Sequence, residues 1–115
     1  MTTRNMYAFL DGIRAVQEEI HQTAVEKGWW DGARSDGELI ALMHSELSEA
    51  LEALRNHNPP DDKIPHFNGA EAELADCIIR ILDMAEARGW NIADALVAKM
   101  AYNKTREHKH GGKRF

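Results

Sequence analysis

The stretches HSELSEALEAL, residues 44–54, and AEAELADCIIRIL, residues 70–82, decide how this chain folds. Apolar residues recur in both at the three-to-four-residue period of an amphipathic helix. Each stretch also carries one pair of acids three residues apart, Glu46 with Glu49 and Glu73 with Asp76. Residues at this spacing share one face of a helix, so each pair directs two carboxylates the same way. Two such helices packed side by side would bring four carboxylates together.

The position of the first acid pair relative to the apolar stripe distinguishes a solvated face from a functional one. Between Leu39 and Leu54, the apolar residues span an arc of about 180° around the helix. Glu46 falls inside this arc and Glu49 lies at its edge, whereas Glu38 lies outside it and is typical of solvated charge. The pattern therefore predicts that this acid pair faces a neighbouring helix.

The second acid pair has the same arrangement. Glu73 is flanked by Cys77, Arg80 and Met84 on the helix surface, and Asp76 lies at the same edge. A carboxylate cluster turned toward a core costs free energy unless cations or hydrogen bonds compensate it. All-oxygen ligation suits Mg²⁺, with Mn²⁺ as a substitute. The alternative is that these are boundary acids paired with basic side chains such as Arg80.

Length and composition predict one all-α domain. The 115 residues are rich in Leu, Ala and Glu, and contain only three prolines. Such a chain buries one modest core, and its residue types favour helices over strands. The formal net charge of −5 argues against a nucleic-acid partner. We expect residues 1–115 to form one domain, with about 107–115 as a flexible basic tail.

The single cysteine, Cys77, cannot form a disulfide within the chain and lies on an apolar helix face. We expect neither a signal peptide nor a membrane partner, because the sequence shows no leader pattern and no run of about 18 apolar residues. Together these features predict a reducing, cytoplasmic location.

Four helices are predicted, at about 5–27, 37–57, 70–88 and 91–106, the last with Asn91 as its N-cap. Prolines interrupt the chain between the second and third helices. The short link through Gly89 predicts that the third and fourth helices are antiparallel neighbours. The third helix is apolar on two sides, with Ile79 and Leu82 opposite Cys77, which suggests a homo-oligomer, most often a twofold dimer. Alternatively, the first helix covers this second face.

The fourth predicted helix carries a polar and basic stripe within an arc of about 100°: Lys99, Tyr102, Asn103 and Arg106. Basic side chains beside a carboxylate-held metal are what phosphate chemistry needs, because the metal and the cations share the phosphate charge. The alternative is a helix C-terminus at which the dipole favours basic residues.

Three residues near the end of the first helix are suited to contact a planar base. Trp29 and Trp30 offer stacking surfaces, and His21 offers a hydrogen bond to a base edge. A hydrophobic plug and a locally paired histidine are the alternatives.

In this order, the motifs resemble those of the MazG-like, all-α nucleoside triphosphate pyrophosphohydrolases. The resemblance runs from about His21 to Arg106 and rests on four motif parts: E-x-x-E at Glu46 and Glu49, E-x-x-D at Glu73 and Asp76, K-x-x-Y-N at Lys99, Tyr102 and Asn103, and the following Arg106. It implies a four-helix, MazG-like bundle that assembles into a homodimer or homotetramer. It also implies hydrolysis of a nucleoside triphosphate to the monophosphate and pyrophosphate, in the house-cleaning of nucleotide pools.

The resemblance also implies residue roles. Glu46, Glu49, Glu73 and Asp76 would bind Mg²⁺, and either Glu46 or Glu49 would be the catalytic general base. Lys99, Asn103 and Arg106 would hold the phosphates. His21, Trp30 and Tyr102 would surround the base.

Two other functions remain open at this point. Phosphoribosyl-ATP pyrophosphohydrolase shares a related helical fold and acidic pattern. A non-catalytic helical interaction module would leave the acids solvated and use the second apolar face of the third helix. A di-iron bundle is disfavoured, because neither acid pair is followed by the histidine that a Glu-x-x-His ligand pair requires.

Overall fold

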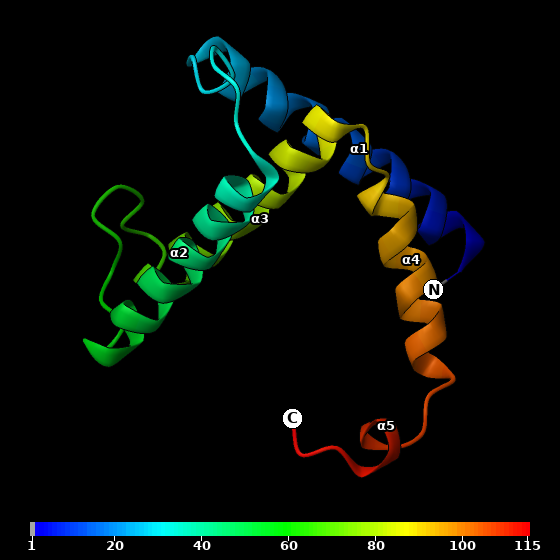
Figure 1. Ribbon diagram of the computed structural model, residues 1–115. Coiled ribbons are helices and arrows are strands. Elements are labelled where there is room, and N and C mark those ends of the chain that lie inside the picture. Colours follow the sequence, from blue (N-terminus) through cyan, green and yellow to red (C-terminus); the bar gives the residue numbers. More distant parts are fainter. Residues whose placement is uncertain (1) are drawn as a thin grey trace.

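The computed structural model describes residues 2–115, and the regular secondary structure of this part of the chain is helical apart from one isolated bridge between Pro60 and Asn68 (Figure 1). Its elements are α1 (Thr3–Glu26), α2 (Asp36–Arg55), α3 (Gly69–Arg88), α4 (Ile92–Lys104) and α5 (Lys109–Gly112). The all-α prediction is confirmed. The ends of the four predicted helices shift by at most two residues. The short α5 lies in the expected basic tail.

Side-chain caps account for where the long helices begin. The cap residues are Thr2, Ser35, Asn68 and Asn91, and each accepts a hydrogen bond from the backbone N–H three residues later. Asn68 forms a complete capping box with Glu71. At the other end of α3, Gly89 has a φ of 70°, the left-handed conformation that closes many helices. The predicted cap at Asn91 is therefore confirmed.

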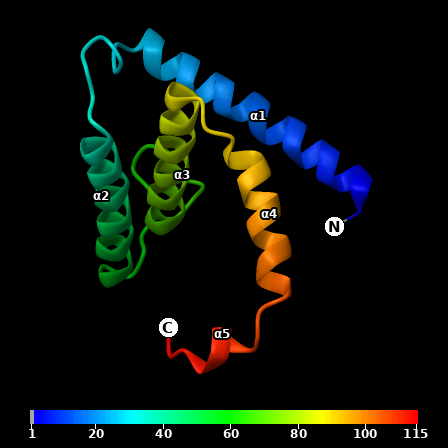
Figure 2. The same cartoon turned by 45° about the vertical axis from the view of Figure 1, so that its right-hand side comes forward.

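The helices α2 and α3 form an antiparallel pair, and α1 crosses the end of this pair where α3 finishes (Figures 1 and 2). Small and apolar side chains fill the contacts between these elements. The buried ones are Leu10, Leu39, Ala50, Ala70, Ala72, Cys77, Leu82, Met84, Ala85 and Ala93. The core is therefore centred on α3, which contacts both α1 and α2.

The prediction that the third and fourth helices are neighbours is wrong. After Gly89 the chain turns, and α4 diverges from α3 and packs on α1 instead (Figure 2). Arg14 of α1 forms an ion pair with Asp94 at 2.7 Å, and the Gln17 amide lies 3.4 Å from the Trp90 carbonyl oxygen. These contacts fix the start of α4 against α1. A short link specifies a turn but does not choose the packing partner.

The segment between α2 and α3 is a folded loop. The Asn58 side-chain oxygen accepts a hydrogen bond from the Ala70 N–H at 2.8 Å, and the Asp61 N–H donates to the Phe67 carbonyl at 2.8 Å. The Asp61 carboxylate also accepts from the N–H groups of Lys63 and of the next residue, each at 2.9 Å. The predicted helix break is confirmed. The loop folds back against the α2–α3 pair.

An apolar face of the α2–α3 pair stays uncovered within the chain. Its members are exposed and recur at helical spacing: Ile40, Leu47, Leu51 and Leu54 on α2, and Leu74, Ile78 and Ile81 on α3. We call these residues the open apolar face. The side of α3 that carries Ile79 and Leu82 is not part of this face, because Leu82 is buried and Ile79 lies beside α1. The alternative that the first helix covers that side is therefore the one that the structure supports, and the open apolar face is a different side of α3. Among residues 2–115, no helix has the length and apolar character needed to cross a membrane.

Candidate functional site

A cleft of about 420 Å³ opens where α1, α2 and α3 meet the two connecting loops. Five carboxylates and four cations line it. The acids are Glu46, Glu49, Glu73, Asp76 and Asp83, and the cations are Lys27, Arg34, Lys63 and Arg80. Trp29, Ile79 and the last turns of α1 complete its wall. All four acids singled out by their spacing thus share one cleft.

Three of these acids form a tight group, which we call the acid cluster. One carboxylate oxygen from each of Glu46, Glu49 and Glu73 lies within 4.8 Å of the others. Asp76 lies one helical turn after Glu73, in the same cleft but outside this group. The antiparallel packing of α2 on α3 brings the two helical faces together, as the matching i, i+3 spacings predicted. The acids come together here rather than pointing separately into solvent.

Glu46 is the most constrained member of the acid cluster. Its side chain is buried, and one oxygen accepts a hydrogen bond from Arg80 Nε at 2.9 Å. The other oxygen, Oε2, is buried and has no hydrogen-bond partner among the described residues. A buried carboxylate oxygen without a partner costs free energy, and a cation would compensate it. The donor set of clustered carboxylates therefore fits a hard divalent cation such as Mg²⁺.

Some acids of the cleft have pKa values that are shifted in different directions. Burial raises the pKa of Glu73, and the neighbouring Glu46 and Glu49 raise it further, to about 8. Burial also acts to raise the pKa of Glu46, but the hydrogen bond and charge of Arg80 help to lower it overall. Burial, and then the charge of Glu46, raise the pKa of Asp76. Without a metal, the cluster therefore retains a proton on Glu73 at neutral pH.

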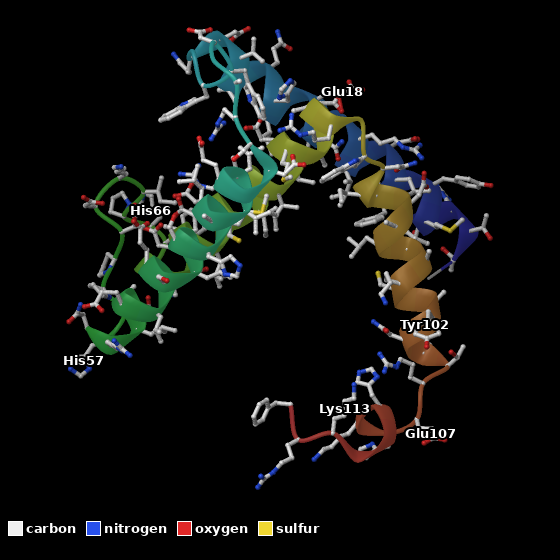
Figure 3. All side chains as sticks on the ribbon, in the orientation of Figure 1. Glu18, His57, His66, Tyr102, Glu107 and Lys113 are labelled. Atoms are coloured by element: carbon white, nitrogen blue, oxygen red, sulfur yellow. The ribbon has the colours of Figure 1, made fainter. Side chains whose placement is uncertain are left out.

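The predicted phosphate-binding residues lie elsewhere. Lys99 and Asn103 are on α4, which diverges from α2 and α3, and Arg106 follows the end of this helix. None of the three lines the cleft. Figure 3 shows Tyr102 on the same distant arm, away from the α2–α3 pair. The basic groups of Lys99 and Arg106 instead lie 5.3 Å and 5.6 Å from the centre of the Tyr102 ring. Within one chain, the basic stripe and the acid cluster do not meet, because α4 packs on α1.

The predicted base-binding pair, His21 and Trp30, is held by an acid that sequence reasoning missed. His21 Nδ1 lies 2.8 Å from an oxygen of Asp83, and Trp30 Nε1 donates to both Asp83 oxygens at 3.0 Å and 3.2 Å. Neither ring lines the cleft, whereas the neighbouring Trp29 does. The local-partner alternative therefore describes His21 in this structure. Asp83 had a readable signal, because it lies two turns after Asp76 on the same face of α3.

Asp83 also anchors the loop between α1 and α2. With Trp30 tied to α3, the Arg34 guanidinium lies 4.9 Å from the centre of its ring and 6.0 Å from that of Trp29. Arg88 of α3 donates to the Arg34 carbonyl at 2.8 Å. These contacts hold the loop against the end of α3 and place Trp29 and Arg34 at the cleft.

No protein-family model, curated protein or solved structure gave a match to this chain.

Proposed function

We propose that this protein is an Mg²⁺-dependent nucleoside triphosphate pyrophosphohydrolase of MazG-like architecture. The reaction converts a nucleoside or deoxynucleoside triphosphate and water into the monophosphate and pyrophosphate. The observation that carries the proposal is the acid cluster, in which Glu46, Glu49 and Glu73 converge and one buried Glu46 oxygen has no partner. Cations and an exposed indole share the same cleft, as a phosphate chain and a planar base require.

Each acid has a role in this proposal. Glu46, Glu49, Glu73 and Asp76 would hold Mg²⁺, and a bound Mg²⁺ would neutralise phosphate charge and lower the pKa of the attacking water. Glu49 is the better candidate for the general base, because its carboxylate is exposed, whereas Glu46 is buried and bound to Arg80. The water contributes one oxygen to the products as the anhydride between the α- and β-phosphates breaks, and the base takes its proton.

We further propose that the protein works as a homodimer. The open apolar face presents seven exposed aliphatic side chains, and a second copy of the same face would bury them. The divergent position of α4 leaves its stripe of Lys99, Asn103 and Arg106 outside its own cleft. In a dimer, this stripe reaches the cleft of the second copy and contributes to holding the phosphates there.

The reaction is tested by incubating the protein with a panel of standard and modified triphosphates and Mg²⁺, and resolving the products. We expect a monophosphate and pyrophosphate in equal amounts. Glu49→Gln should lower kcat strongly while the thermal unfolding profile stays intact, and Glu38→Gln on the same helix is the matched control. Orthophosphate as the direct product, without any monophosphate, would reject the reaction.

The contribution of α4 from a second copy is tested by mixing two inactive variants. Glu49→Gln and Lys99→Ala would each disable a different half of the shared site. Random pairing in a twofold dimer leaves about a quarter of the sites intact. The mixture should therefore regain about a quarter of wild-type activity. A mixture no more active than the mean of its components would place the basic stripe outside the site.

A further inference from the structure

Among the residues that the structure describes, three basic side chains at the cleft have no acidic partner: Lys27, Arg34 and Lys63. They come from the C-terminal end of α1, the α1–α2 loop and the α2–α3 loop, respectively. Within residues 2–115, none of them forms an ion pair or donates a side-chain hydrogen bond, whereas the fourth cation, Arg80, is bound to Glu46. The cleft thus offers three cationic groups with free donors, which we call the cationic rim.

The loop that carries Lys63 is ordered by its own backbone contacts. The Asp61 carboxylate binds the Lys63 N–H at 2.9 Å, and the Asp61 N–H is bound to the Phe67 carbonyl at 2.8 Å. Burial mainly raises the pKa of Asp76, and the nearby Lys63 ammonium partly opposes this rise. Lys63 therefore lies close enough to the acids for its charge to act on them, although it is not paired with any of them.

Arg34 is held in place from the opposite wall of the cleft. Its guanidinium packs over Trp30, which is anchored to Asp83, and its carbonyl accepts a hydrogen bond from Arg88. A guanidinium stacked on an indole keeps its N–H donors free at its edge, where they fit phosphate oxygens. The Arg34 side chain is thus already ordered before an anion binds, so binding loses little of its conformational entropy.

The balance of charge at the cleft makes anion binding depend on metal. Five carboxyl groups and four cations line the cleft, so an anion meets no net positive charge there. Divalent cations bound by the acids would leave the cationic rim in excess, and the cleft would then attract a polyanion. Metal and anion would each raise the affinity of the other, because such coupling is reciprocal.

We propose that Lys27, Arg34 and Lys63 bind the phosphate chain of the substrate within a single chain, and that this binding requires metal in the acid cluster. The inference rests on the proposed function, since it assigns the phosphate contacts of the same site. It differs from the assignment to α4, because the cationic rim needs no second copy.

Isothermal titration calorimetry with inorganic tripolyphosphate tests the rim without a base or a reaction. The magnesium complex of tripolyphosphate is titrated into protein in Mg²⁺, and free tripolyphosphate into protein in EDTA. We expect binding only in Mg²⁺. Lys27→Ala, Arg34→Ala and Lys63→Ala should each weaken it by at least about fivefold, because each removes a charge-assisted contact. Lys63→Arg should restore most of the affinity.

Lys113→Ala is the matched control, because it removes the same charge from the exposed tail and should bind as the wild type does. Unfolding by heat verifies that each variant is folded, since the backbone hydrogen bonds of Lys63 and Arg34 survive truncation of their side chains. Wild-type affinity in all three rim variants would overturn the inference, and so would a wild-type protein that fails to bind tripolyphosphate. Loss of binding in the rim variants of a protein that cleaves no triphosphate would instead sustain the rim and reject the proposed reaction.

Discussion

Mg²⁺ binding should expel a proton from the acid cluster, and the pKa of Glu73 sets how much. With this pKa at about 8, Glu73 is about 90% protonated at pH 7 and about 10% protonated at pH 9. A carboxyl group must be ionised to ligate a hard cation, so binding releases about 0.9 protons per site at pH 7 and about 0.1 at pH 9. By the same linkage, the apparent Mg²⁺ affinity should rise about tenfold between pH 6 and pH 7.

Calorimetry in buffers of different ionisation enthalpy measures this proton release directly. Glu73→Gln removes the titrating group, so the variant should bind Mg²⁺ more weakly and release almost no proton at pH 7. Glu38→Gln, an exposed acid at the start of α2 that does not line the cleft, is the control and should behave like the wild type. Mg²⁺ binding by the wild type at pH 7 without proton release would contradict a protonated Glu73. Release of as many protons by the Gln variant as by the wild type would contradict it equally.

Three further outcomes follow from the structure. The folded-state pKa of Glu73 is raised above its ordinary 4.5 to about 8, so the metal-free folded state holds a proton that the unfolded state loses. Thermal unfolding in EDTA should therefore show the stability of the wild type falling as pH rises from about 4.5 to 8, whereas Glu73→Gln should lack this decrease. A wild type without the decrease would mean that the acid cluster is not crowded. Asp83→Ala leaves the Trp30 indole and the His21 imidazole without their hydrogen-bond partner, so urea unfolding should show that the free energy of unfolding falls by about 1–3 kcal/mol. A change near zero would mean that these contacts do not anchor the loop. Ile78→Asp places a charge in the open apolar face. We expect sedimentation to show a dimer of the wild type and a monomer of this variant, with Glu52→Gln as an exposed control on the neighbouring helix. A variant that sediments as the wild type does would place the interface elsewhere or reject the dimer.

The helices and the convergence of the acids could be predicted from the sequence because both depend on local periodicity. Glu46 and Glu73 each occupy a defined position on an amphipathic helix, and packing α2 on α3 brings those positions together. The caps at Asn68 and Asn91 likewise involve residues only three positions apart. Such features can be recognised in the sequence because the residues that form them stand at fixed, short spacings.

The position of α4 could not be predicted in this way, because it depends on contacts between residues far apart in the chain. The Arg14–Asp94 ion pair and the contact of Gln17 with Trp90 place α4 on α1, and neither has a signature in local spacing. Likewise, the sequence indicates that Trp30 can stack or donate a hydrogen bond, but not that Asp83 takes its donor. Chemical capability was readable from the residue type, whereas the choice of partner was decided by tertiary packing.

The ion pair of Arg80 with Glu46 has a consequence for how the protein matures. A centre built only from carboxylates would repel itself and keep the chain unfolded until an ion bound, in the way that small zinc-dependent domains stay unfolded without zinc. Here a resident guanidinium and a retained proton offset the repulsion, so the helices can assemble in a metal-poor environment. Folding and metal binding would thus be separate events, and we expect the metal-free protein to remain folded until it binds Mg²⁺.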